Sequence, residues 1–201
     1  AQTRTGHVNN TVWVNQDYFF VMKFNRPVVD SLYLPMGETE KGKRIIASFD
    51  MQPGDELMMK VALSTTSIDG AKKNLEAEIP AWDFEGVRTA AHNEWNNYLS
   101  RIEIEGTDDE KTNFYTCFYH ALIQLNQISD VDSMYRNAAD SIVKAGTGAF
   151  YSTFSLWDTY RAAHPFYTLV IPERVDGFVN SLIEQGEVQG FLPIWGLWGK
   201  E

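Results

Sequence analysis

The sequence predicts an α+β protein that begins with an antiparallel sheet and ends in helices. Over residues 1–70, short segments rich in β-branched and aromatic residues alternate with turn signals. After residue 80, apolar residues recur every three or four positions, which is the period of an amphipathic helix. We therefore divide the chain into a sheet part (residues 1–80), a linker helix (81–106) and a helical part (107–201).

Composition narrows the class of protein. With 201 residues, 44% hydrophobic and 22% charged, the chain is long enough to bury a core and reads as globular. Its net charge of −10 and its lack of a Lys/Arg stripe argue against a nucleic-acid partner. No apolar run approaches the ~18 residues of a membrane span. The single cysteine, Cys117, lies in an apolar helical segment, so we expect a buried, unreactive thiol.

Four strands are expected in the sheet part. They are "NTVWVN" (10–15), "DYFFVMKFN" (17–25), "KRIIASFD" (43–50) and "ELMMKVALS" (56–64). A free-standing sandwich usually has about seven strands or more, so four strands predict an antiparallel sheet or part of a sandwich.

Four helices are expected in the remainder. Asp83 is placed to cap a helix that runs to residue 102, and Thr107 with Glu110 has capping-box spacing. The helix after Thr107 is apolar nearly all round, so other helices should enclose it. A third begins near Ser155, and a fourth runs from Pro172 to Gly186. Four helices cannot surround one another, which predicts that the chain is part of a larger helical assembly.

The segment "TFSLWDTYRAAHP" (153–165) concentrates polar and aromatic side chains between apolar runs. In one reading Ser155 and Asp158 form a capping box. In the other, Asp158 accepts sugar hydroxyls and Trp157 covers the apolar face of the ring. Arg161 then keeps the carboxylate ionised or binds a hydroxyl itself. His164 before Pro165 predicts a kink, with the histidine in a structural role.

Two loops add further candidates. "GFLPIWGLWGKE" (190–201) places Trp195, Trp198 and Glu201 on a Gly/Pro-rich loop, which suits a carbohydrate pocket, or else tryptophans that plug the seam between sheet and helices. "SDVDSMYR" (129–136) lacks the Gly and Glu of an EF-hand loop, so we interpret it as a rigid Asx-rich turn.

The string "FSLWDTYRAAHP", followed by "FYTLVIPERV", resembles the signature helix of the bacterial glycoside hydrolase family 92 α-mannosidases. "LSTTSIDGAKKNLEAEIP", "FYTCFYHAL", "SDVDSMYR" and "GFLPIWGLWGKE" occur in that family's order, so the resemblance covers residues 15–201. It implies the end of a β-sandwich, a linker and the first helices of an incomplete (α/α)6 barrel. It also implies a calcium-dependent, inverting exo-α-mannosidase that acts on mannose-containing glycans in the bacterial periplasm or at the cell surface.

The resemblance also assigns residues. Trp157 and Asp158 match the pair placed against the terminal mannose, and Glu201 matches the Glu of a loop near the same subsite; Trp198 of that loop completes our substrate-binding set. Lys200 stands where the family often has Asn. The family's general acid, base and Ca²⁺ ligands lie beyond residue 201, so no catalytic or metal residue is assigned and this segment alone is expected to be inactive. The alternative is a non-catalytic carbohydrate-binding module or a structural sandwich–helix unit.

Overall fold

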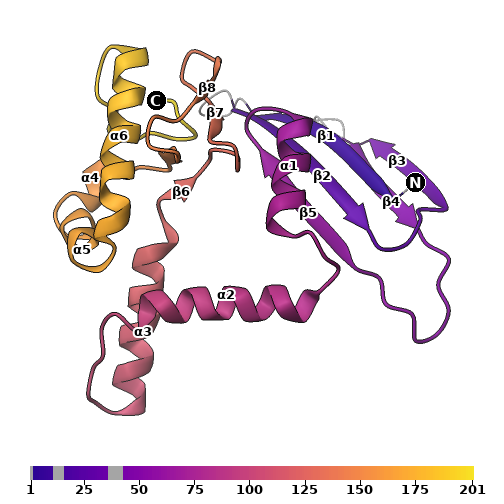
Figure 1. Ribbon diagram of the computed structural model, residues 1–201, viewed down its shortest axis with the longest axis horizontal. Helices are drawn as coiled ribbons and strands as arrows, with labels where there is room; N and C mark the ends of the chain where they lie inside the picture. The colour runs from indigo at the N-terminus through magenta and orange to yellow at the C-terminus, as the bar shows by residue number, and fades with distance from the viewer. Residues whose placement is uncertain (1, 11–15, 36–42) are drawn as a thin grey trace.

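The computed structural model describes residues 2–10, 16–35 and 43–201, and it confirms the α+β class (Figure 1). One antiparallel sheet has the strand order β1-β2-β5, formed by β1 (Thr3–Asn10), β2 (Gln16–Phe24) and β5 (Met59–Ser64). A separate two-stranded antiparallel sheet is formed by β3 (Asp30–Pro35) and β4 (Lys43–Ser48).

Three of the four predicted strands are confirmed, as β2, β4 and β5. Most of the strand predicted at 10–15 lies outside the described residues. The sequence does not predict β1 or β3. Strand β1 is largely polar, so no alternation of apolar and polar residues marks it. Its antiparallel pairing with β2, from Thr3 opposite Lys23 to Asn10 opposite Gln16, makes it a strand.

Helix α1 (Ile68–Glu78) covers one face of the three-stranded sheet and begins before the change to helices expected near residue 80 (Figure 1). Ser67 caps it by accepting a hydrogen bond from the Gly70 amide. Ala71 and Leu75 pack into a buried cluster with Val21 of β2 and Ala62 of β5. Most other side chains of α1 are charged or polar, so its helical periodicity is weak in the sequence.

Helix α2 (Phe84–Leu99) leads from the sheet to α3 (Asp108–Ile123) (Figure 1). Both predicted helix starts are confirmed. The Asp83 carboxylate accepts a hydrogen bond from the Gly86 amide at 2.8 Å. Thr107 and Glu110 form both halves of the capping box, and the hydrogen bonds from Thr107 lower the pKa of Glu110.

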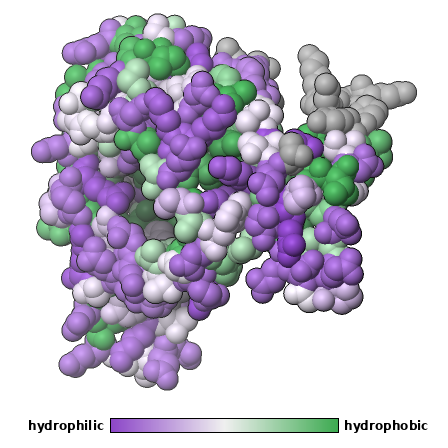
Figure 2. Space-filling view, turned by 45° about the vertical axis from the view of Figure 1, so that its right-hand side comes forward, coloured by the Kyte–Doolittle hydropathy of each residue, from purple (hydrophilic) through white to green (hydrophobic). Residues whose placement is uncertain are grey.

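The prediction that other helices enclose α3 is wrong for the described chain. Phe118 is its one buried residue, and Cys117 is exposed instead of buried. Helix α3 packs on one side, where Phe118 contacts Phe166 and the Tyr167 hydroxyl donates to the Ala121 carbonyl at 2.9 Å. Trp95 of α2 also packs on Tyr119, but most other residues of α3 are exposed among the described residues. Over the molecule as a whole, Figure 2 shows hydrophobic side chains at the surface between hydrophilic ones.

The main core lies around α5 (Ala163–Val170), α6 (Pro172–Gln189) and the strand pair β6 (Asn126–Gln127) and β9 (Tyr151–Ser152). Its buried residues are Phe118, Leu125, Tyr151, Phe154, Tyr167, Val170, Ile171 and Phe178. Pro172 begins α6 as predicted. The helix continues past Gly186, however, because the residue that adopts the left-handed conformation is Gly190, at φ 84°. Within the described ranges, no helix is long and apolar enough to cross a membrane.

A polar junction connects the sheet and α1 to the segment before β7 (Met134–Arg136), which pairs with β8 (Ile142–Lys144). At its centre Asp130 is 3% exposed. Its carboxylate accepts hydrogen bonds from Ser64 at 2.8 Å, Thr66 at 2.6 Å and Asn74 at 2.8 Å. The Asx-rich turn predicted at 129–136 is confirmed, since the Ser133 amide donates to the Asp130 carbonyl and the Met134 amide to the Asp132 carboxylate.

Candidate functional site

Two segments that the sequence marks separately lie side by side. The Phe154 amide donates to the Gly196 carbonyl at 3.1 Å, and the Leu156 amide donates to the Ile194 carbonyl at 2.9 Å. These main-chain bonds hold the segment with Trp157 and Asp158 against the loop with Trp195. Trp157 and Trp195, one from each segment, therefore lie on one surface.

Trp157 and Trp195 form a pair of indoles at this surface. Their ring centroids are 5.9 Å apart and the rings are inclined by 59°. Trp157 is 72% exposed and Trp195 is 42% exposed, so neither indole is sealed in a core. An inclined indole pair presents apolar faces in two directions, which suits contact with the C–H faces of pyranose rings.

Asp158 follows Trp157 in the single-turn helix α4 (Leu156–Thr159) and is exposed. The Ser155 hydroxyl donates to Asp158 Oδ2 and caps no amide of α4, so the capping-box reading is not realised. Oδ1 makes no hydrogen bond within the described part of the chain. The carboxylate of Asp158, the residue after Trp157, thus keeps acceptor capacity.

The expected contact between Arg161 and Asp158 is not formed. The Arg161 Nε donates to the Tyr160 hydroxyl at 2.6 Å, and the guanidinium lies 5.3 Å from the Tyr160 ring centroid. Tyr160 is 53% exposed and is a further exposed aromatic side chain of this segment, which the sequence does not mark as a binding residue. Its place in the quoted 153–165 segment is the signal that could have identified it.

The kink predicted at His164–Pro165 lies elsewhere. The helix breaks between α4 and α5, and Pro165 sits in the first turn of α5, where a missing amide proton costs little. His164 has a structural position between the rings of Phe154 and Tyr167. Its Nε2 is buried without a partner, and burial lowers the pKa of the imidazole.

Glu201 closes the loop back on itself. Its Oε2 accepts a hydrogen bond from the Ile194 amide at 2.7 Å. The carbonyl of the same Ile194 accepts the hydrogen bond from the Leu156 amide. Glu201 therefore lies against the strand-like contact that joins the two segments. Lys200 is buried and forms an ion pair with Asp140, so this departure from the family pattern has a structural partner.

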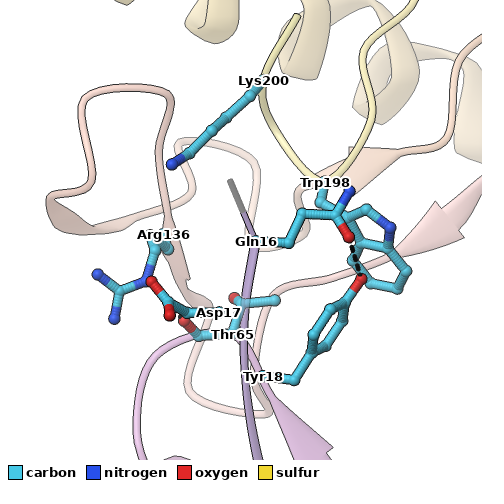
Figure 3. A pocket seen from close by; sticks show the side chains of 7 residues that line it. All are labelled: Gln16, Asp17, Tyr18, Thr65, Arg136, Trp198 and Lys200. Atoms are coloured by element: carbon cyan, nitrogen blue, oxygen red, sulfur yellow. Dashed lines mark hydrogen bonds between the residues drawn. The ribbon is translucent and has the colours of Figure 1, made fainter. Parts of the chain in front are cut away.

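Trp198 lies apart from the indole pair. It meets the ring of Tyr18 on β2 edge to face at 4.9 Å and lines a small cavity at the seam between sheet and helical part (Figure 3). The cavity, of about 10 Å³, has room for about one water molecule and not for a sugar. Burial raises the pKa of Tyr18 to about 12. Trp195 thus has the exposed position expected of a carbohydrate-binding indole, and Trp198 has the position expected of an indole at the seam between sheet and helices.

Comparison with known proteins identifies the family. The model of the glycosyl hydrolase family 92 catalytic domain matches residues 70–201. The chain belongs to this family. No curated protein matches it significantly.

Solved structures support family 92 membership over the whole chain. The family 92 α-mannosidase BT3965 from Bacteroides thetaiotaomicron is 28% identical over 100% of this chain, with a TM-score of 0.90. The inverting mannosidase BT2199 from B. thetaiotaomicron VPI-5482 is also 28% identical over 100%, with a TM-score of 0.87. The family 92 glycosyl hydrolase ccman5, 18% identical over 94% of this chain and 26% of its own, shares the fold with a TM-score of 0.75.

This chain spans 29% of the length of BT3965 and of BT2199. The shared family does not by itself place a metal in this part. Within residues 2–10, 16–35 and 43–201, no group of three or more His, Cys, Asp or Glu side chains is arranged to hold a metal ion. Asp130, the most enclosed candidate, is occupied by two hydroxyls and an amide. These residues do not fit a calcium site.

Proposed function

We propose that the complete protein is an exo-acting α-mannosidase that inverts anomeric configuration, and that this chain supplies part of the subsite for the terminal mannose. One observation carries the proposal: all of this chain matches the family 92 α-mannosidase BT3965 at 28% identity and a TM-score of 0.90. A second structure of BT3965 is a complex with mannoimidazole, at a TM-score of 0.89.

Asp158 and the indole pair give the proposal a chemical basis. The Asp158 carboxylate accepts hydrogen bonds, and sugar hydroxyls donate them, so each contact is charge-assisted. The faces of Trp157 and Trp195 offer apolar area next to this acceptor. A pyranose ring has both surfaces, hydroxyls at its edge and C–H bonds on its faces, and a site with both binds it in one orientation.

Inversion requires two carboxyl groups on opposite faces of the sugar, about 6.5–9.5 Å apart, one as general acid and one as general base. We assign neither role to Asp158 or to Glu201. The Asp158 carboxylate accepts a hydrogen bond from the Ser155 hydroxyl, and the Glu201 carboxylate accepts one from the Ile194 amide. In our proposal both groups act in binding and loop closure, and the acid and base come from the rest of the complete protein. This chain alone is then inactive.

Calcium dependence and a periplasmic or cell-surface location complete the proposal for the parent enzyme. Calcium would supply contacts to sugar hydroxyls, with ligands from outside this chain. Terminal α-linked mannose on glycans would be the substrate.

The test is hydrolysis of α-mannobiosides of defined linkage by the complete protein, followed by proton NMR. An inverting enzyme releases β-mannose first, before mutarotation. Release of α-mannose first would contradict inversion, and binding of mannobiose without hydrolysis would favour a sugar-binding module. A parallel reaction with chelated calcium tests metal dependence.

A further inference from the structure

Ser152 of β9 has a hydroxyl that reaches the loop beside the candidate site. The side chain is 1% exposed. Its Oγ donates to the Gly196 carbonyl at 2.9 Å and accepts from the Gly199 amide at 3.0 Å. One buried hydroxyl thus binds the residue that precedes the turn at Leu197–Lys200 and a residue within that turn.

The turn itself has an unfavourable backbone. Trp198 and Gly199 are consecutive residues with left-handed φ values of 54° and 79°. Glycine adopts this conformation readily, but a tryptophan does so at a steric cost. The bridge between Leu197 and Lys200 closes the turn from within, with N–O distances of 2.7 and 3.1 Å. The Ser152 hydroxyl stabilises it from outside.

The turn decides where three predicted binding residues go. Before it, Trp195 lies on Trp157; within it, Trp198 points to Tyr18, as Figure 3 shows; after it, Glu201 returns to the Ile194 amide. If the turn relaxes, the ends of the loop lose their fixed separation. Trp195 and Glu201 then lose the alignment that brings them to the Trp157 surface.

We propose that Ser152 is a positioning residue, whose hydroxyl fixes the turn so that Trp195 and Glu201 are held at the sugar-binding surface. The part of the inference that concerns hydrolysis rests on the proposed function. The part that concerns the placement of Trp195 rests on geometry alone.

Ser152→Ala tests the inference, with Ser181→Ala as its matched control. Ser181 is also 1% exposed, and its hydroxyl also makes two hydrogen bonds, from the Tyr151 amide at 2.9 Å and to the Gly177 carbonyl at 2.7 Å. Both variants therefore lose one buried hydroxyl and two bonds. Ser181 connects β9 to α6 and does not touch the turn.

The first readout is the near-ultraviolet circular dichroism of the coupled indoles, defined as the signal lost in both Trp157→Phe and Trp195→Phe. We expect Ser152→Ala to lose it and Ser181→Ala to retain it. Retention in Ser152→Ala, or equal loss in both variants, overturns the inference. If Ser152→Ala does not fold, Ser152→Cys carries the test, because the thiol keeps the shape with a weaker donor; its signal should then be reduced, and an unchanged signal again overturns the inference.

The second readout is kcat/KM of the complete enzyme on an α-mannobioside. Because small misplacements of binding groups reduce rates by up to about 100-fold, we expect Ser152→Ala to approach that loss and Ser181→Ala to stay within a few-fold. If the unsubstituted enzyme does not hydrolyse α-mannosides, the proposed function fails, while the dichroism result still decides the role of Ser152. If it does hydrolyse them and both variants lose kcat/KM equally, the positioning role fails.

Discussion

Two aspartates in short turns, Asp130 and Asp158, have opposite surroundings in this protein. Asp130 is 3% exposed. Its carboxylate accepts hydrogen bonds from a hydroxyl of β5, a hydroxyl of the β5–α1 connection and a side-chain amide of α1. Asp158 is exposed, contacts the Ser155 hydroxyl through one oxygen, and lies beside the indole of Trp157. The sequence predicts a rigid Asx-rich turn around Asp130 and a sugar-binding role for Asp158.

The difference shows what separates a structural carboxylate from one available to a ligand. A buried carboxylate requires partners for its lone pairs, and at Asp130 the fold provides three donors shared over both oxygens. At Asp158 the fold provides one donor, the Ser155 hydroxyl, and the remaining lone pairs of the carboxylate can accept hydrogen bonds from solvent or substrate. Burial and the number of donors, not residue type or spacing, distinguish the two.

The largest expected effect is the loss of stability in Asp130→Ala. This change leaves the hydroxyls of Ser64 and Thr66 and the amide of Asn74 buried without their acceptor. Since hydrogen bonds to a charged group contribute about 1.5–3 kcal/mol each, and their loss is not additive, we expect the free energy of unfolding to fall by about 3–5 kcal/mol. Urea denaturation measures it.

Asp132→Ala is the control for Asp130, two residues further along the same turn. Asp132 pairs with Lys73 at the surface, at 2.7 Å. Exposed ion pairs contribute little, so this variant should stay close to the unsubstituted protein. Equal losses in the two variants would show that the turn as a whole, and not the Asp130 carboxylate, carries the stability.

The second effect is on activity. Asp158→Asn keeps the shape of the side chain but removes its charge, so a charge-assisted contact to the sugar becomes a neutral one. We expect kcat/KM of the complete enzyme to fall by roughly 10- to 150-fold, equivalent to about 1.5–3 kcal/mol, with no change in unfolding midpoint. Asp176→Asn on α6, an exposed aspartate outside the site, is the control. Full activity in Asp158→Asn would remove Asp158 from the sugar subsite.

Local chemistry made part of the fold predictable. The sequence predicts three helix starts, namely the caps at Asp83 and Thr107 and the first residue of α6 at Pro172. Each of them depends only on residues within one turn of the helix. Strand β1 and helix α1 depend instead on pairing with β2 and on packing over Val21, contacts between distant parts of the chain. Their own composition is too polar to reveal them.

The candidate site divides in the same way. The sequence identifies Trp157, Asp158, Trp195 and Glu201, and main-chain bonds bring them together. Nothing in the spacing of Trp195 and Trp198 tells which indole faces solvent, because the left-handed turn between Gly196 and Lys200 decides it. The predicted burial of Cys117 is wrong for a similar reason. A side chain on an apolar helix is buried only where another element covers that side of the helix.

The third prediction compares these two tryptophans by stability. Trp198 packs edge to face on Tyr18 in the seam, whereas Trp195 is 42% exposed. Trp198→Ala should lower the free energy of unfolding by about 1–3 kcal/mol, less than a fully buried tryptophan would, and Trp195→Ala should stay within about 0.5 kcal/mol. Urea denaturation of both variants tests this. A larger loss in Trp195→Ala would reverse the roles given to the two indoles.

The smallest expected effect is a pH dependence of stability from His164, whose ring lies between those of Phe154 and Tyr167. Burial holds the pKa of this imidazole below its ordinary value of about 6.5. The unfolded chain then binds more protons than the folded one below about pH 6.5, so the stability from neutral His164 is complete above that pH and falls as the pH drops.

Replacing the ring tests this directly. His164→Phe keeps an aromatic ring between Phe154 and Tyr167 but cannot titrate, so its stability should fall less between pH 7 and pH 5, measured by urea denaturation at each pH. His92→Gln is the control, because His92 is exposed on α2 and its ring contacts only Asn96 among the described residues. If the free energy of unfolding falls equally with pH in His164→Phe and in the unsubstituted protein, another group causes the acid sensitivity. The protonation of His164 then makes no contribution to the pH dependence of stability.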